Sequence, residues 1–105
     1  MLKNKQEVKK VFLKDIVYIK STGRKLTFFF VDEDPFEIYG KISDTESQLS
    51  DCGFLRTQKS YIVNTAYIDK ITNYKVYLIT GKILPISETY YDSIEKDYIL
   101  RKGFK

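Results

Sequence analysis

The sequence contains no histidine and a single cysteine, Cys52. These scarcities remove the usual zinc ligands and the Ser-His and Cys-His pairs of nucleophilic catalysis. One cysteine cannot form an internal disulfide, and no apolar run is long enough for a membrane span or a signal peptide. We therefore expect a cytoplasmic protein that is not an enzyme, uses no metal or other cofactor and does not associate with a membrane.

Glycine motifs are also missing, because the five glycines are scattered singly and form no phosphate-cradling pattern. We predict that they occupy turns and helix caps. The acidic run at 32–34 directly precedes Pro35 between two strand-like segments. Such a run can form a cation site or an acid/base pair, but its position favours a solvated turn.

What the chain does contain indicates one folded domain spanning residues 1–105. Its mass is 12.4 kDa, and hydrophobic residues make up 43% and aromatic residues 15% of it, which favours β-structure. Lys and Arg number 18 against 14 Asp and Glu, giving a formal net charge of +4. This charge is compatible with a polyanionic partner but does not require one.

Short strand-like segments separated by turn residues dominate the sequence and predict a mainly β fold. Ser21, Thr22, Gly23 and Arg24 form a short connection typical of a hairpin with outward-pointing side chains. The second half of the chain is typical of an antiparallel meander. The expected strands cover residues 11–13, 16–19, 26–31, 36–39, 54–55, 61–63, 67–71, 75–79 and 83–86.

Two helices are expected between these strands. The first is a short surface helix near 44–51, with Ser43 and Glu46 forming a capping box and Gly53 ending it. Its apolar content is low, so we expect it to lie across the sheet as a connection.

The second expected helix lies near 88–101 and carries Tyr91, Ile94 and Tyr98 at helical spacing, with Gly103 placed to stop it. This stripe indicates core packing, with a dimer interface as the alternative.

A polar cluster between two apolar runs is the best candidate for a binding site, because a rigid scaffold would present its five side chains at one place. Arginine and lysine neutralise phosphates, glutamine can bond a base edge, and hydroxyls suit phosphate oxygens, so the cluster favours nucleic acid. The alternative is an ordinary solvated turn. Its members are Arg56, Thr57, Gln58, Lys59 and Ser60, between 54–55 and 61–63.

Four motifs occur together in a fixed order: Asp-Ile-Val-Tyr-Ile at 15–19, Gly-Phe-Leu-Arg at 53–56, Ser-Tyr-Ile-Val-Asn at 60–64 and Leu-Pro-Ile-Ser at 84–87. Together they resemble the LytTR DNA-binding domain family of bacterial response regulators, over roughly residues 15–91. The resemblance implies small antiparallel sheets with short helices. It also implies that loops, instead of a recognition helix, enter successive major grooves of repeated DNA sites, with two protomers bound.

By position, the family's three contact loops correspond to residues 21–24, to 56–60 and to the segment around Ser87 and Glu88. We expect Arg24 and Lys59 to read guanine edges, and Gln58 to read adenine or touch the backbone. Arg56 and Ser60 are expected to hold phosphates. Asn64 is expected to be structural, bonding the backbone of the following turn.

Two positions depart from the family pattern. Gln58 stands where a histidine is usual, so hydrogen bonding is kept but a titratable charge is lost. Glu88 stands where a basic residue is common, and a carboxylate there faces phosphates unfavourably unless it accepts from a cytosine amine.

The resulting prediction is a sequence-specific double-stranded DNA-binding domain, the output domain of a bacterial transcriptional regulator. The alternative is a protein-protein interaction module that pairs with another regulator and binds DNA weakly or not at all. A homodimer on DNA is a further possible assembly. The chain has no room for a phospho-acceptor domain, so a receiver domain is a possible partner if the chain is a fragment.

Overall fold

The computed structural model describes residues 1–96 of the chain. It contains ten strands, two α-helices and two short 3-10 helices. The α-helices are α1 (Ile42–Leu49) and α2 (Glu88–Ile94), and the 3-10 helices are η1 (Leu13–Asp15) and η2 (Thr65–Tyr67). The strands are β1 (Leu2–Lys3), β2 (Val8–Lys9), β3 (Ile16–Thr22), β4 (Lys25–Phe30), β5 (Phe36–Tyr39), β6 (Phe54–Gln58), β7 (Tyr61–Asn64), β8 (Ile68–Thr72), β9 (Lys75–Leu78) and β10 (Ile83–Pro85).

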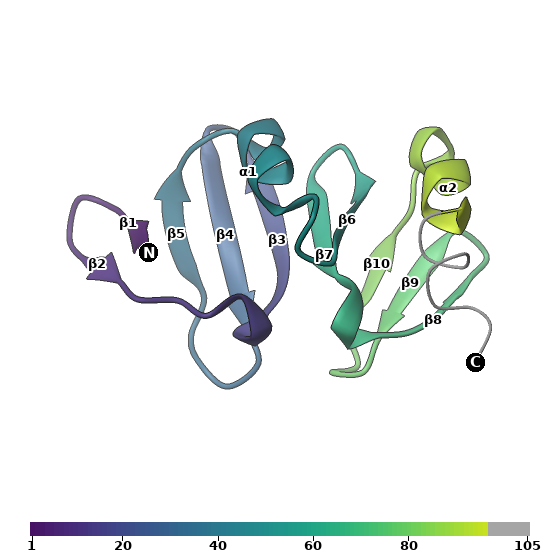
Figure 1. Cartoon of the computed structure of the whole chain (residues 1–105), viewed down its shortest axis with the longest axis horizontal. Coiled ribbons are helices and arrows are strands. Elements are labelled where there is room, and N and C mark those ends of the chain that lie inside the picture. Colours follow the sequence, from purple (N-terminus) through teal and green to yellow (C-terminus); the bar gives the residue numbers. More distant parts are fainter. Residues whose placement is uncertain (97–105) are drawn as a thin grey trace.

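The strands form three antiparallel sheets (Figure 1). The largest has the order β5-β4-β3-β7-β6, the second is the β10-β9-β8 meander, and the smallest pairs β1 with β2. The predicted mainly β fold of small antiparallel sheets with two helices is therefore confirmed.

The central strand β3 is buried on both faces, because Ile16, Val17, Tyr18 and Ile19 are each at most 7% exposed. Its pairing with β4 shifts between Ile16 and Tyr18, which inserts one extra residue on β3. Such a bulge lets two consecutive side chains point to the same face. Accordingly, Val17 and Tyr18 belong to one hydrophobic cluster, whereas Ile16 and Ile19 belong to the other.

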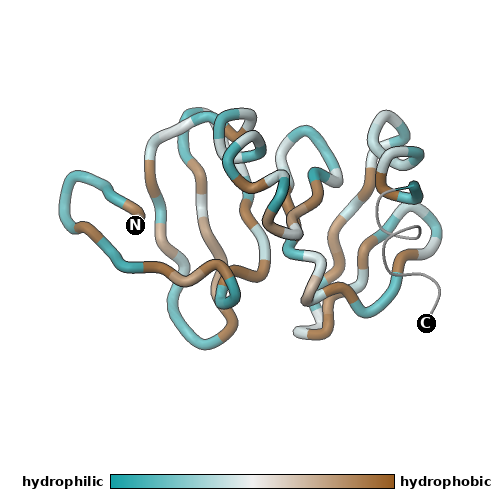
Figure 2. The backbone as a smooth tube through the Cα atoms, in the orientation of Figure 1, coloured by the Kyte–Doolittle hydropathy of each residue, from teal (hydrophilic) through white to brown (hydrophobic). Residues whose placement is uncertain are grey.

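These two clusters form the core on opposite sides of β3. The first cluster joins the five-stranded sheet to α1, through Ile42 and Leu49. The second joins β3 and β7 to the three-stranded sheet and to Ile94 of α2. Hydrophobic segments run through the strands of both sheets, whereas the loop between β6 and β7 is polar (Figure 2).

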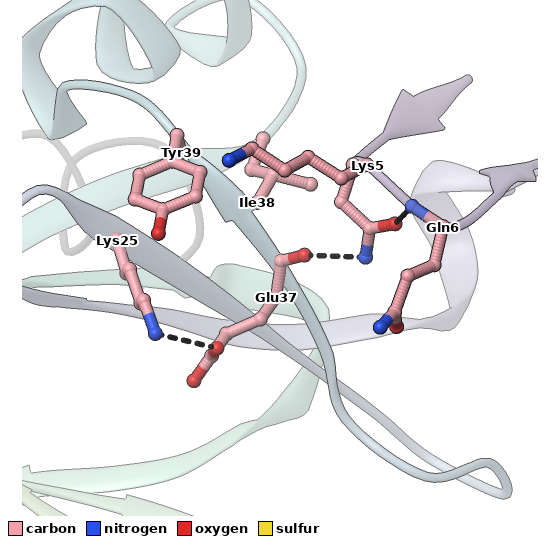
Figure 3. Close-up of a pocket in the computed structure, with 7 residues that line it drawn as sticks. Lys5, Gln6, Lys25, Glu37, Ile38 and Tyr39 are labelled. Carbon is pink, nitrogen blue, oxygen red and sulfur yellow. Dashed lines mark hydrogen bonds and ion pairs between the residues drawn. The ribbon is translucent and has the colours of Figure 1, made fainter.

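The N-terminal hairpin β1–β2 covers part of the β5 edge, an arrangement that the sequence pattern did not predict. Asn4 Nδ2 donates a 2.9 Å hydrogen bond to the Glu37 carbonyl. Within the sheet, Lys25 Nζ on β4 lies 3.5 Å from Glu37 Oε1 (Figure 3). An exposed strand edge invites pairing with another chain. The contact from Asn4 therefore restricts access to the β5 edge.

The predicted capping box is wrong, because α1 begins at Ile42 with Lys41 as its cap and without a side-chain cap bond. Ser43 lies inside the first turn, where its carbonyl accepts a 3.2 Å hydrogen bond from Ser47 Oγ. Glu46 instead contacts Arg56. Ile42 is buried and forms part of the helix, so the helix begins before Ser43. This tertiary contact outweighs the local capping preference.

Residues 11–13 do not form the expected strand. Instead, η1 begins at Leu13 and leads into β3.

At the other end of the chain, α2 is described as far as Ile94, so the expected extension to 101, with Tyr98 and Gly103, lies outside the described residues. Ile94 is buried in the second cluster, which confirms its predicted core role. Neither helix in residues 1–96 has the length and hydrophobicity of a membrane span.

Candidate nucleic-acid interface

The first predicted contact loop is the tip of the β3–β4 hairpin. Its two turn residues are Gly23, at φ 61°, and Arg24. A positive φ at the first central position is typical of a type II′ hairpin turn, which glycine adopts without steric cost. Thr22 and Arg24 are exposed, and Ser21 is partly buried. The tight turn therefore places exposed Arg24 at the tip of the β3–β4 hairpin.

The second predicted loop joins β6 to β7 and contains a bulge. Arg56 pairs with Ile62 and Gln58 with Tyr61, so Thr57 is the extra residue. Thr57 is completely buried, and the expectation that all five polar side chains of this cluster are presented together is therefore wrong. Lys59 is exposed at the turn, and Gln58 Oε1 accepts a 3.1 Å hydrogen bond from the Ser60 amide.

The third predicted loop leads from β10 into α2. Ser87 is the cap residue of α2, but its hydroxyl is buried and has no hydrogen-bond partner among residues 1–96. Glu88 is exposed in the first helical turn. This loop therefore presents a carboxylate, whereas the other two present cations.

Two main-chain hydrogen bonds bring the three loops together. The Ser21 amide donates to the Ser60 carbonyl at 2.8 Å, and the Ser87 amide donates to the Thr57 carbonyl at 3.0 Å. In Figure 1 the three segments lie along the upper side of the molecule. We call this surface the contact edge, defined by residues 21–24, 56–60 and 87–88.

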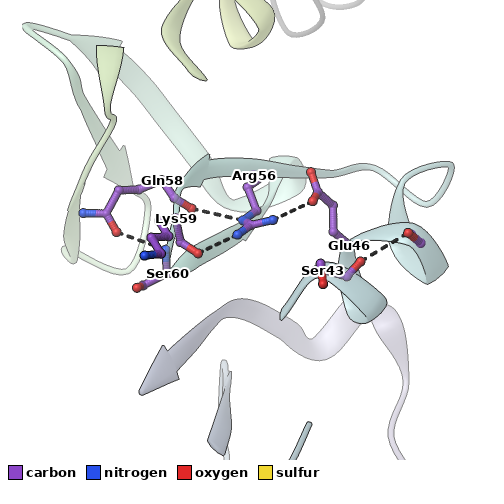
Figure 4. A network of polar contacts seen from close by, with 7 residues as sticks. Ser43, Glu46, Arg56, Gln58, Lys59 and Ser60 are labelled. Carbon is purple, nitrogen blue, oxygen red and sulfur yellow. Dashed lines mark hydrogen bonds and ion pairs between the residues drawn. The ribbon is translucent and has the colours of Figure 1, made fainter. Parts of the chain in front are cut away.

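Arg56 lies at the centre of the contact edge and is largely buried, with its side chain 12% exposed. Its Nη1 donates to Glu46 Oε1 at 2.7 Å, its Nη2 to the Lys59 carbonyl at 2.7 Å and its Nε to the Gln58 carbonyl at 3.2 Å (Figure 4). The guanidinium also lies 5.6 Å from the centre of the Tyr90 ring of α2. The predicted phosphate contact by Arg56 thus competes with a set of contacts inside the protein.

Sequence reasoning missed three residues at this surface: Lys41, Glu46 and Tyr90. Lys41 is exposed beside the first loop and lines a groove with Arg24 and Arg56. Glu46 and Tyr90 contact Arg56 from α1 and α2, respectively. No local motif marks Lys41 or Tyr90, and the motif that includes Glu46 predicts a helix cap instead of a contact with Arg56.

Asn64 is structural, as expected, and contributes nothing to the exposed edge. It is 5% exposed, its Oδ1 accepts from the Ala66 amide at 3.0 Å, and its Nδ2 donates to the Ile16 carbonyl at 2.9 Å. It therefore links the end of β7 to η2 and to the start of β3.

Comparisons with known proteins agree with this architecture. The model of the LytTr DNA-binding domain family matches residues 6–98. A solved LytTr DNA-binding domain from Bacillus cereus superposes with a TM-score of 0.77 at 22% identity, covering 90% of this chain and 91% of that one. At this identity the likeness establishes the fold.

Two curated relatives come from Bacillus subtilis strain 168. The transcriptional regulatory protein NatR is 30% identical over 80 residues, covering 76% of this chain and 34% of NatR. The sensory transduction protein LytT is 30% identical over 92 residues, covering 79% of this chain and 36% of LytT. The chain thus spans about a third of the length of these relatives. With the family model matching most of its length, the chain belongs to the LytTr DNA-binding domain family.

Proposed function

We propose that the chain binds double-stranded DNA sequence-specifically through the contact edge. The observation that carries the proposal is a pair of main-chain hydrogen bonds that join three loops of distant sequence: the Ser21 amide donates to the Ser60 carbonyl, and the Ser87 amide donates to the Thr57 carbonyl. A rigid scaffold that presents several loops at one place is the usual basis of recognition by loops. Exposed Arg24 and Lys59 supply positive charge there, and exposed Lys41 lines a groove beside them.

Within this proposal the side chains divide by chemistry. Arg24 and Lys59 read guanine edges, where cationic donors meet the O6 and N7 acceptors. Gln58 keeps its amide nitrogen for a base or a phosphate while its Oε1 holds the Ser60 amide. Thr22 and Ser60 contact the DNA backbone, which positions the loops without reading sequence.

The similarity to a transcriptional regulatory protein and to a sensory transduction protein supports a role as the output domain of a bacterial regulator. On this view the DNA carries repeated sites, two protomers bind together, and a receiver domain controls them. Each of these three points belongs to the proposal.

Selection of bound duplexes from a random DNA pool tests the proposal. The wild type is compared with Arg24→Ala and Lys59→Ala, and with Lys3→Ala as a control that removes an exposed charge from the N-terminal hairpin. We expect the wild type and the control to enrich one repeated motif. Each loop variant should lose preference at particular base pairs, by about 1–3 kcal/mol per lost contact.

Binding should also weaken steeply with salt, because each neutralised phosphate releases counterions. If the wild type enriches no sequence at low salt, sequence-specific binding is wrong. The exposed carboxylate of Glu88 on the contact edge favours protein-protein interaction as the second candidate function. A protein partner that binds in high salt and protects the contact edge would support that candidate.

A further inference from the structure

Arg56 is positioned to hold the second contact loop in place. Its Nη2 and Nε donate to the carbonyls of Lys59 and Gln58, at 2.7 Å and 3.2 Å. These carbonyls belong to exposed Lys59 and to Gln58, whose Oε1 accepts a hydrogen bond from the Ser60 amide (Figure 4). A planar guanidinium has a fixed fork of donors, so binding two adjacent carbonyls restricts the path of the backbone between them.

The guanidinium is itself fixed from both helices. Glu46 Oε1 on α1 accepts from Nη1 at 2.7 Å, and the Tyr90 ring on α2 lies 5.6 Å from the guanidinium carbon. Glu46 is 41% exposed by side chain and Arg56 12%, so the charge pair lies at the boundary between solvent and protein. The loop is therefore connected through one side chain to two elements outside it.

We propose that Arg56 is a positioning residue held by Glu46, and that this pair sets the sequence specificity of the second contact loop. The inference rests on the proposed DNA-binding function and names residues that control it. It also replaces the expectation that Arg56 binds a phosphate, because each of its three nitrogens already donates a hydrogen bond to a protein group and the side chain is only 12% exposed.

The proposal predicts an effect of removing the Glu46 carboxylate that is opposite to the ordinary electrostatic effect on DNA affinity. Removing a carboxylate near a DNA-binding surface ordinarily strengthens binding to every sequence, since repulsion of phosphates decreases. If Glu46 holds Arg56, its loss should instead weaken binding to the preferred site while binding to random DNA is kept or increased.

The main experiment compares Glu46→Gln with Asp44→Asn. Both residues lie on α1 and both changes remove one negative charge at nearly constant shape, but Glu46 contacts Arg56. Affinities are measured for the selected duplex and for a scrambled duplex. We expect Glu46→Gln to lower the ratio of these affinities by about tenfold, the size of one lost base contact, and Asp44→Asn to leave the ratio unchanged. Equal ratios in the two variants would overturn the proposal.

A second comparison separates positioning from phosphate binding by Arg56. Arg56→Lys keeps the charge but loses the fork, so we expect the same loss of specificity with an unchanged salt dependence. A phosphate contact predicts the opposite: Arg56→Lys should bind almost normally, and Arg56→Ala should reduce the slope of log K against log salt by about 0.9. That second pattern would contradict the positioning role.

Amide hydrogen exchange without DNA distinguishes failure of this inference from failure of the proposed function. In Glu46→Gln, but not in Asp44→Asn, the amides of residues 58–60 should exchange faster. Faster exchange in a protein that selects no DNA would support the loop contact while refuting DNA recognition. Unchanged exchange in a protein that does select DNA would overturn the inference and leave the proposed function intact.

Discussion

Tyr18 is a core side chain whose ionisation makes the stability of the folded protein depend on pH. It is 7% exposed, and its ring stacks on Phe29 with centroids 4.3 Å apart and a 12° angle between the planes. Burial raises the pKa of its hydroxyl above the ordinary value of 10.0, and neighbouring Tyr61 raises this pKa further. The folded state therefore favours the neutral phenol.

This shift predicts a loss of stability in alkali. Unfolded Tyr18 releases its proton near pH 10.0, whereas the folded residue keeps it to higher pH. Its contribution is complete below pH 10.0 and falls as the pH rises through the folded pKa. We expect Tyr18→Phe, which keeps the stacked ring, to lose less unfolding free energy in alkali than the wild type.

Urea unfolding below and above pH 10.0 checks this expectation. Tyr39→Phe is the control, because Tyr39 is 62% exposed and should behave as the wild type does. If Tyr18→Phe and the wild type lose the same free energy of unfolding above pH 10.0, the predicted role of Tyr18 is wrong.

Residue roles were predictable where they depend on local chemistry. Asn64 at a strand end was correctly expected to bond the following turn, and its Nδ2 also reaches Ile16, a contact that spans 48 positions. Thr57 was wrongly expected to be presented with its neighbours, because a bulge turns it inward. Neither the bulge nor the distant partner leaves a local signal in the sequence.

At the scale of elements, the two tight turns at Gly23 and Gly81 form a natural pair. Both glycines have positive φ, 61° and 98°, and neither has an atom within 4 Å of the position where a Cβ would be added, among the described residues. A substitution at either therefore acts through backbone conformation alone. Gly23 lies on the contact edge, whereas Gly81 lies between β9 and β10 at the lower side of Figure 1.

We expect Gly23→Ala and Gly81→Ala each to lower the free energy of unfolding, by roughly 1–2 kcal/mol, because an L-residue is strained at positive φ. Specific DNA binding should fall in Gly23→Ala alone, since that turn carries Arg24. Chemical unfolding and DNA titration of both variants measure the two effects. Equal loss of DNA binding in both would show that stability, and not loop position, controls recognition.

The elements themselves were predictable where periodicity was strong. The β8-β9-β10 meander and the β3–β4 hairpin agree with the expected segments. The β1–β2 hairpin was missed, because two-residue strands are too short to show alternation, and part of their support comes from Glu37 of β5. The α1 start was misplaced, because burial of Ile42 outweighed the local capping signal.

At the scale of the whole molecule, β3 contributes side chains to both hydrophobic clusters. Ile16 and Ile19 contribute to one cluster, and Val17 and Tyr18 to the other. Neither cluster can lose its order without exposing side chains of the same strand. We therefore expect the described part of the chain to unfold as one cooperative unit.

Leu26→Ala and Leu84→Ala test this cooperativity, because the two leucines are each 1% exposed and lie in different clusters. Each variant should lose about 2–5 kcal/mol of unfolding free energy. Amide signals from β4 and from β9, followed by NMR in urea, should disappear together in both variants. Leu13→Ala, at a 43% exposed position, should change little. If the amide signals of β4 and β9 disappear at different urea concentrations, the prediction of a single cooperative unfolding unit is wrong.

The two hydrogen bonds that join the loops use main-chain atoms at both ends. Their geometry therefore does not depend on which side chains occupy the loop tips. Positions 22, 24, 59 and 88 are exposed and can be varied together while the frame beneath them is preserved. A combinatorial library at these four positions is thus a practical route to domains with reprogrammed DNA specificity, provided that Arg56 and Glu46 are kept.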